Sequence, residues 1–263
     1  MKDLKIAVRG AGEMASGIAH RLYSAGLHKI VMTEIVQPLT VRRTVSFSEA
    51  VYEGETGVEG VRGVLANNVD EIHTIWEESM IAVIIDPIGD SVGRLNPDIL
   101  IDAMMLKKQT LLKGNEAPFV IGVGPGFTAP VNVHVVIESN RGHNLGRVIW
   151  DGSAEPHTGI PGNTSGFTVE RVLRSPKAGV VRHASHISDS VAKGDLLLYV
   201  DDTPVYAPIN GVLRGLIREI SVQHNEKIGD VDPRGQIAYC YSISDKARAI
   251  GNGVLEAIMR QYN

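Results

Sequence analysis

Apolar and polar positions in the first 34 residues follow the order strand, turn, helix, strand. Residues 4–9 are apolar and partly β-branched, which is typical of a strand. A glycine turn follows, and residues 14–26 then repeat their apolar positions at helical spacing. Residues 28–34 predict a second strand that ends in Glu34. This order is typical of an α/β domain with a parallel sheet.

The strand pattern continues along the next part of the chain. Residues 80–85 form a continuous apolar run, as expected for a strand buried on both faces, and the run ends at Asp86. Residues 97–103 supply another strand, which carries Asp102. Ligands of open parallel sheets collect beyond the carboxyl ends of the strands. Each acid therefore either contacts a ligand or caps a following turn. We interpret residues 1–117 as a Rossmann-like nucleotide-binding domain.

Residues 118–170 are rich in glycine and polar side chains. A predicted strand enters the turn formed by Gly124, Pro125 and Gly126, whose backbone N–H groups can form an anion-binding nest. A further strand is expected over residues 131–138. Several charged or histidine side chains accompany it: His134, Glu138, Arg141, His143, Arg147 and His157. The arginines favour an anionic ligand, and the alternative is a loop-rich subunit interface. No compact metal-ligand motif is present, so we expect no metal.

An internal repeat occupies residues 174–233. Pro176 and Pro208, and likewise Gly179 and Gly211, are offset by 32 residues. Each Pro-x-x-Gly-Val turn is followed by a second turn that contains Lys, Gly and Asp. The arrangement resembles the paired hairpins of biotinyl/lipoyl-type barrel-sandwich domains.

The tip between the two copies, residues 199–206, contains no lysine. Covalent attachment of biotin or lipoate is therefore excluded, and we interpret residues 171–235 as a structural or interaction module. Residues 236–263 predict a C-terminal helix that packs on the body. The fold class is thus α/β, with a mostly parallel Rossmann-like sheet followed by a mainly β region that includes a barrel-sandwich module.

The first glycine turn has the spacing of a dinucleotide-binding turn. Gly10 allows the tight turn, Gly12 lets the backbone approach a pyrophosphate, and Ala15 permits close packing of helix on strand. Glu34 lies 22 residues after Gly12, where an acid that binds a ribose hydroxyl is expected. The alternative is a turn that only packs the domain, with Glu34 in solvent.

Two arginines, Arg42 and Arg43, follow the second predicted strand. If the loop that carries them folds back toward the turn, one of them meets the 2′-phosphate of NADP. The sequence therefore leaves both NAD and NADP open as ligands.

Composition narrows the classes of partner. The formal net charge is −4 and no basic run occurs, so the chain lacks the electrostatic pattern of a nucleic-acid-binding protein. The one cysteine, Cys240, excludes an intrachain disulfide, and we expect it to be a small buried hydrophobe rather than a nucleophile. No apolar stretch approaches the ~20 residues of a membrane helix. We therefore expect a cytoplasmic protein without membrane or nucleic-acid partners.

Seven stretches together resemble one known family, the accessory proteins of the bacterial selenium-dependent molybdenum hydroxylase system. The resemblance spans nearly the whole chain, although residues 53–117 show little beyond the fold pattern. It implies a role in maturing a molybdenum hydroxylase, such as a xanthine dehydrogenase type enzyme. The stretches are residues 8–12, 32–35, 41–52, 122–129, 140–150, 228–235 and 243–251.

Three hypotheses follow. The first is a maturation factor that binds NAD(P) or another anionic dinucleotide, such as a pterin dinucleotide, and contacts the hydroxylase or its other maturation factors. The second is an NAD(P)-dependent oxidoreductase that acts on a small metabolite, with His143 as the candidate proton donor. The third is a non-catalytic scaffold that docks the target hydroxylase. A homo-oligomer is compatible with all three.

In the first hypothesis, two groups of residues contact the ligand. The nucleotide is held by Gly10, Gly12, Ala15 and Glu34, and the anionic partner site is lined by Arg42, Arg43, Gly124, Gly126, Arg141 and His143.

Overall fold

The computed structural model describes residues 1–105 and 112–263, and its chain separates into two units. The first unit comprises Met1–Pro38, Val45–His157 and Ile243–Asn263, and the second comprises Leu39–Thr44 and Thr158–Ser242. This division differs from the four predicted segments, because residues 118–157 belong to the first unit and residues 39–44 to the second. The second unit is therefore inserted into the first.

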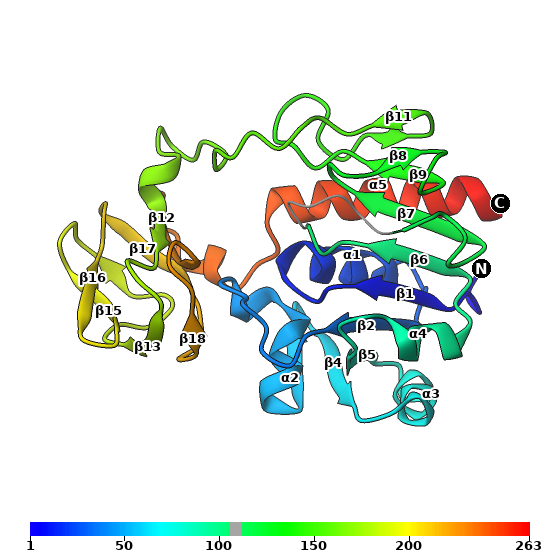
Figure 1. The fold of residues 1–263 in the computed structure, drawn as a ribbon, viewed down its shortest axis with the longest axis horizontal. Helices are drawn as coiled ribbons and strands as arrows, with labels where there is room; N and C mark the ends of the chain where they lie inside the picture. Colours follow the sequence, from blue (N-terminus) through cyan, green and yellow to red (C-terminus); the bar gives the residue numbers. More distant parts are fainter. Residues whose placement is uncertain (106–111) are drawn as a thin grey trace. The chain divides into compact units, whose positions relative to one another are not determined.

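A sheet of nine strands forms the centre of the first unit (Figure 1). Its order is β10-β9-β7-β6-β1-β2-β5-β4-β3. The seven strands from β9 to β4 run parallel, and the edge strands β10 and β3 run antiparallel to their neighbours. The strands are β1 (Ile6–Arg9), β2 (Ile30–Glu34), β3 (Glu55–Val58), β4 (Val61–Ala66), β5 (Ile81–Ile85), β6 (Ile99–Asp102), β7 (Phe119–Val123), β9 (Val135–Ile137) and β10 (Val148–Ile149). The predicted α/β class with a mostly parallel sheet is confirmed.

Helices cover both faces of this sheet. On one face α1 (Glu13–Ser24) and α5 (Asp245–Tyr262) pack against side chains such as Ile6 and Val8, and on the other α3 (Val69–Glu77) and α4 (Asp90–Leu95) pack against Ala7. Smaller elements complete the unit. They are the 3-10 helix η2 (Phe47–Glu49), the helix α2 (Ala50–Glu53), and the strand pair β8 (Thr128–Ala129) and β11 (Gly152–Ser153); the 3-10 helix η1 (Arg43–Val45) lies where the chain passes from the second unit into the first.

The strand expected over residues 131–138 is shorter than predicted. Only Val135–Ile137 is extended, because the N–H groups of Val131 and Asn132 both bond to the carbonyl of Thr128 and close a turn. Residues 131–134 of the predicted strand therefore belong to a loop at the amino end of β9, and Glu138 follows the strand.

Helices α1 and α5 approach each other through small residues. A Cβ added at Gly17 would lie 2.7 Å from the Cβ of Ala247 and 3.2 Å from its carbonyl oxygen. Gly251, one turn further along α5, faces the next turn of α1, since its added Cβ would lie 3.1 Å from the Cβ of Arg21. These contacts run in the same direction along both helices, so α1 and α5 are parallel and begin at the same edge of the sheet.

Gly17→Val is expected to lower the free energy of unfolding of the first unit by about 1–3 kcal/mol, because the larger side chain overpacks the α1–α5 contact. Urea unfolding followed by tryptophan fluorescence measures this change, since Trp76 and Trp150 both lie in the first unit. Gly93→Ala in α4 is the matched control, since nothing lies within 4 Å of its added Cβ. Gly93→Ala should raise the free energy of unfolding slightly, because alanine has a higher helix propensity than glycine. Equal changes in the free energy of unfolding for Gly17→Val and Gly93→Ala would contradict the close contact between α1 and α5.

The second unit contains two four-stranded antiparallel sheets, with the orders β12-β19-β17-β14 and β16-β15-β13-β18. Its elements are η3 (Val169–Arg171), β12 (Val172–Arg174), β13 (Gly179–His183), β14 (Ser190–Val191), β15 (Leu196–Val200), β16 (Thr203–Tyr206), β17 (Gly211–Leu216), β18 (Ser221–Val222), β19 (Lys227–Asp232) and η4 (Ile237–Cys240).

The sequence repeat is visible in the strand pairing of this unit. Its first copy forms β13, β14 and β15, its second forms β17, β18 and β19, and Gly179 and Gly211 each begin the first strand of a copy. Within each copy the first strand pairs with the third. The middle strands are exchanged, because β14 pairs with β17 and β18 pairs with β13. The two copies are thus interleaved.

Buried ion pairs lie within the same unit. The carboxylate of Asp230 is fully buried and contacts the guanidinium groups of Arg171 and Arg214. Asp232, also buried, pairs with Arg214 at 3.1 Å and with Arg234 at 2.6 Å.

Among the described residues, no helix is both long enough and apolar enough to cross a membrane.

Candidate functional site

The glycine turn lies at the carboxyl edge of the sheet, where the chain changes direction about β1. From β1 the chain passes through α1 to β2 on one side, whereas β6 lies on the other side. Gly10 has φ +91°, and an added Cβ would lie 3.4 Å from the Cα of Met104. Glycine is therefore favoured there by its backbone conformation, whereas the space around its Cα would accept a Cβ at ordinary contact distance. Crevices at such a reversal of strand order are where open α/β sheets bind ligands.

Helix α1 begins directly after this turn. Gly12 is its N-cap residue with φ −70° and ψ −176°, and as a glycine it has no side chain that could cap the helix. The first-turn N–H groups of a helix point outward and carry the positive end of its dipole. The start of α1 is therefore suited to an anionic group such as a pyrophosphate.

Glu34 holds the turn in place from the end of β2. Its Oε1 accepts a hydrogen bond from the N–H of Ala11 at 3.1 Å, and its Oε2 accepts one from Ile35 at 2.7 Å. Burial raises the pKa of Glu34, although these two N–H groups act against the shift. The side chain is thus fixed beside the turn, in contrast to the alternative in which it lies in solvent.

Ala15 and Ser16 pack the start of α1 against the body. Ala15 is buried, as its predicted packing role requires. The hydroxyl of Ser16 donates to the carbonyl of Ala11 at 2.9 Å and accepts from the N–H of Phe47 at 2.8 Å. Hydrogen bonds from Glu34 on one side and Ser16 on the other therefore hold the turn in one conformation.

An ion pair crosses the reversal point next to the turn. Arg9 ends β1, Asp102 ends β6, and the two are register partners joined from Nη1 to Oδ2 at 2.9 Å. Burial raises the pKa of Asp102, while Arg9 and the N–H of Met104 oppose the shift. The position of Asp102 at a strand end is predictable from the sequence, but the role of Arg9 is not, although it directly precedes Gly10.

Asp86 caps α4. Its carboxylate accepts hydrogen bonds from the N–H groups of Gly89, Asp90, Ser91 and Val92. Of the two roles considered for this acid, the structure gives it the capping one.

The second glycine turn follows β7, two strands away from β1 in the sheet. Gly124 has φ +83° and Gly126 has φ +100°. A Cβ at Gly124 would lie 2.5 Å from the hydroxyl oxygen of Ser139, so the loops after β7 and β9 are in close contact. Both predicted glycines therefore lie at the same edge of the sheet as Gly10 and Gly12.

Arg141 and His143 lie in the loop between β9 and β10. The guanidinium of Arg141 makes two hydrogen bonds to Asp245 at the start of α5, at 2.6 and 3.0 Å. His143 is exposed. The ion pair joins this loop to α5. The guanidinium of Arg141, which the sequence predicted to bind an anionic ligand, is thus paired with a carboxylate of the same chain.

Lys246, which the sequence did not single out, lies in the first turn of α5. Burial lowers its pKa, and Arg141 adds to the effect, while Glu13, Glu138 and Asp245 oppose it. Glu13 begins α1 and Glu138 follows β9. Lys246 therefore places a half-buried cation close to the start of α1.

Arg42 and Arg43 belong to the second unit and have structural roles there. Arg42 is buried and donates from Nη2 to the carbonyls of Tyr239 and Ser242, at 2.9 and 3.0 Å. Arg43 donates from Nε to the carbonyl of Leu216 at 2.7 Å. These guanidinium groups bind main chain, so they do not line the site that the first unit forms by itself.

The remaining candidates are not gathered at the turn. The Nδ1 atom of His134 accepts a hydrogen bond from the N–H of Val120 at 3.0 Å, and His157 is exposed at the end of the first unit.

Cys240 is buried, and burial raises the pKa of its thiol, which opposes formation of a thiolate. Within residues 1–105 and 112–263, no three His, Cys, Asp or Glu side chains are grouped as a metal site requires.

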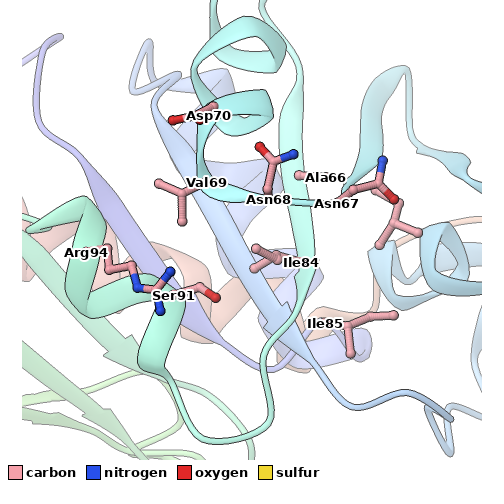
Figure 2. A pocket seen from close by; sticks show the side chains of 10 residues that line it. Ala66, Asn67, Asn68, Val69, Asp70, Ile84, Ile85, Ser91 and Arg94 are labelled. Carbon is pink, nitrogen blue, oxygen red and sulfur yellow. The ribbon is translucent and has the colours of Figure 1, made fainter.

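A cavity of about 590 Å³ opens at the carboxyl ends of β4 and β5 (Figure 2). Ile85 contributes to its lining and is the register partner of Glu34 on the neighbouring strand β2. The volume falls in the range of ligand pockets, about 300–1,000 Å³.

Comparison with known proteins gives one sequence relative. The chain is 45% identical over 255 residues to the uncharacterized protein YqeB of Escherichia coli (strain K12), and the aligned part covers 97% of this chain and 47% of YqeB. The chain thus spans about half the length of that relative. No protein-family model matches the sequence.

Solved structures are similar only at a distance. The protein TcdA (CsdL) is 12% identical with a TM-score of 0.32, over 98% of this chain and 89% of its own. The apo form of the ectoine utilization protein EutE (DoeB) from Ruegeria pomeroyi is 12% identical with a TM-score of 0.25, over 86% of this chain and 85% of its own. Values this low assign neither fold nor function.

Proposed function

We propose that the chain binds a dinucleotide of the NAD type at the first glycine turn, in a Rossmann-like domain. The observation that carries this proposal is the arrangement of three features at one edge of the sheet. The N-cap residue Gly12 has no side chain to cap α1, Gly10 has a positive φ that favours glycine, and Glu34 is fixed beside the turn. The pyrophosphate would meet the N–H groups of α1, and Glu34 would accept from a ribose hydroxyl.

Glu34 favours NAD over NADP in this proposal. A carboxylate accepts hydrogen bonds from the free 2′- and 3′-hydroxyls of NAD but repels the 2′-phosphate of NADP. Arg42 and Arg43, the sequence candidates for binding that phosphate, bond to main-chain carbonyls of the second unit. A pterin dinucleotide shares the pyrophosphate and ribose, and therefore remains a candidate ligand of the same turn.

Titration of the full chain with NADH, NADPH, ATP and molybdopterin dinucleotides tests the proposal. Saturable binding of a dinucleotide supports it, and failure of all four to bind contradicts it.

Glu34→Gln is expected to weaken NADH binding about tenfold and to reduce the preference over NADPH, because a charge-assisted hydrogen bond contributes roughly 1.5–3 kcal/mol. Nicotinamide fluorescence measures both dissociation constants. Glu55→Gln, on the exposed edge strand β3, is the matched control and should leave both unchanged. An unaltered NADH affinity in Glu34→Gln would place the ribose elsewhere.

We further propose that the protein acts in the cytoplasm as a maturation factor for a selenium-dependent molybdenum hydroxylase. The support is the resemblance carried by the seven sequence stretches. The interleaved hairpins of the second unit are consistent with a barrel-sandwich hybrid module, and the tip at residues 199–206 has no lysine to carry biotin or lipoate. The module would then dock the hydroxylase or its other maturation factors. Copurification with the hydroxylase, and its loss on deletion of residues 158–242, tests this role.

A second candidate function is an NAD-dependent oxidoreductase. It is favoured by two titratable groups at the same edge of the sheet, Asp102 with a raised pKa and Lys246 with a lowered pKa. Such shifts bring an acid and a base closer to neutral pH, where proton transfer is efficient. Turnover of NADH with a small carbonyl compound would support this candidate over a purely binding role.

A further inference from the structure

Ser139 has a buried hydroxyl that faces the second glycine turn. The residue is only 3% exposed, and a Cβ added at Gly124 would lie 2.5 Å from its Oγ. Within residues 1–105 and 112–263, no group forms a hydrogen bond with this hydroxyl. A buried polar group without a partner is destabilising, and a ligand oxygen that reaches the hydroxyl would remove this cost.

Hydrogen bonds fix the position of Ser139. The carboxylate of Glu138, the preceding residue, accepts from the N–H of Asn140 and from the N–H of Glu155, both at 2.7 Å. On the other side, the N–H of Gly124 donates to a carbonyl of β9 at 2.8 Å. The hydroxyl therefore has a defined place beside the Gly124 turn.

Lys246 brings a positive charge to the same edge of the sheet from α5. The residues that follow it are packed on both sides. Ala247 contacts Gly17 of α1, and the carbonyl oxygen of Ala249 would lie 2.5 Å from a Cβ added at Gly146 in the loop between β9 and β10. In the part of the chain that the structure describes, the ammonium group of Lys246 has no hydrogen bond and no ion pair.

The charges around Lys246 agree with this position. Glu13 at the start of α1 and Glu138 at the end of β9 both act to raise the pKa of Lys246, as Asp245 does, which places the ammonium between α1 and β9. Burial and Arg141 outweigh these carboxylates, so the pKa is lowered. The ammonium is therefore incompletely compensated, and a bound anion would stabilise its charged form.

Short contacts connect the first glycine turn with Ser139 along the carboxyl edge. A Cβ at Gly10 would lie 3.4 Å from the Cα of Met104, and a Cβ at Gly124 would lie 3.6 Å from the Cε of Met105. Both methionines follow β6, which lies between β1 and β7 in the sheet. Two strand spacings separate β1 from β7, about 10 Å. A ligand whose pyrophosphate lies on α1 can therefore extend over β6 to Ser139.

We propose that Ser139 and Lys246 bind a carboxylate beside the second nucleoside of the dinucleotide. The hydroxyl and the ammonium each donate to the carboxylate oxygens. The exposed N–H of Gly126 is a third donor at the same turn, since it has no acceptor among the described residues. Only the placement beside the dinucleotide rests on the proposed function, because the carboxylate site includes no residue of the first glycine turn.

Two sources can supply the carboxylate: the second ring of the dinucleotide, or a separate small acid beside it. Calorimetric titration of the full chain with two matched pairs of ligands distinguishes them. Nicotinic acid adenine dinucleotide and NAD differ only in a carboxylate and a carboxamide, as malonate and malonamide differ in both of their end groups. The acid is expected to bind about tenfold more tightly than its amide. A preference within the dinucleotide pair places the carboxylate on the ring, and a preference confined to malonate places it on a separate acid.

Substitutions at the two side chains test their roles. Lys246→Met should weaken binding of the acid about tenfold and leave the amide unchanged, whereas Lys246→Arg keeps the charge and should keep the preference. Ser139→Ala should weaken the acid about five- to tenfold. Lys29→Met and Ser24→Ala are the matched controls and should bind like the unaltered chain, because Lys29 pairs with Asp3 ahead of β2 and Ser24 ends α1, both far from the carboxyl edge.

Malonate is titrated with and without NAD, so that the two proposals fail separately. If neither dinucleotide binds, the proposed function is wrong, while the malonate pair still tests the carboxylate site. Gly12→Val should leave malonate binding unchanged. Equal affinities within both pairs, or an acid preference that survives in Lys246→Met, would overturn the inference. Circular dichroism checks the fold of Lys246→Met, and Ser139→Ala takes its place if that variant does not fold.

Discussion

Replacing Gly12 with valine is expected to weaken dinucleotide binding at least about 100-fold while the chain remains folded. The added side chain occupies the space through which a pyrophosphate reaches the N–H groups of α1, and loss of two hydrogen bonds to a charged group corresponds to roughly 3 kcal/mol or more. The backbone of Gly12 has φ −70° and ψ −176°, which valine adopts without strain. Fluorescence titration with NADH measures the loss, and circular dichroism checks the fold.

Gly57→Val is the matched control for this substitution. Gly57 lies on the exposed edge strand β3, its φ is not positive, and its added Cβ would have only an ordinary contact, 3.9 Å from the carbonyl oxygen of Val61. The control should bind NADH like the unaltered chain. If Gly12→Val also retains its affinity, the pyrophosphate does not lie on α1.

Removal of the Asp230 carboxylate has the largest expected effect on stability. Asp230→Ala should lower the free energy of unfolding of the second unit by about 3–5 kcal/mol, because Arg171 and Arg214 would then be buried without their shared counter-charge. Hydrogen exchange of peptides from residues 158–242 reports on this unit directly. Asp202→Ala, which removes an exposed partner of Lys177, should leave the exchange unchanged.

The same carboxylate predicts a pH dependence. Burial acts to raise the pKa of Asp230, but Lys227, Arg214 and Arg171 together outweigh it and hold the pKa below the usual value. Because the folded pKa is the lower one, the stabilisation is complete above the unfolded value of about 3.9 and is lost as the pH falls through the folded value. Asp230→Ala should abolish this part of the acid sensitivity, and a variant that keeps it would contradict the assignment.

The parts of the fold that the sequence predicts are those encoded by local pattern. The order strand, turn, helix, strand over residues 4–34 is observed as β1, α1 and β2, and the offset of 32 between Gly179 and Gly211 is observed as equivalent strands. The hairpin of β3 and β4 was not predicted. Its first strand carries exposed Glu55 and Gly57, and it is extended because it pairs with β4, which local propensity does not encode.

Of the candidate site, the sequence predicted the glycines, the position of Glu34 and the position of Asp102. Gly10, Gly12 and Glu34 are close because parallel neighbours end at one edge of the sheet, a regularity of the fold class. Arg42 and Arg43 were predicted near the turn because they follow β2 in the sequence, whereas hydrogen bonds to residues 173 to 200 positions away determine where they lie. Lys246 carries no local signal, because the packing of α5 against the body defines its surroundings.

The insertion of residues 158–242 between β11 and α5 has a consequence for synthesis on the ribosome. The sheet of the first unit is complete at the level of its strands by residue 149, but the face that α5 covers stays open until residues 245–262 have been made. The second unit, in contrast, has all of its residues once position 242 has left the exit tunnel. The first unit, whose synthesis begins first, therefore completes its fold last. Its apolar face stays accessible to chaperones while the ribosome translates the whole insertion.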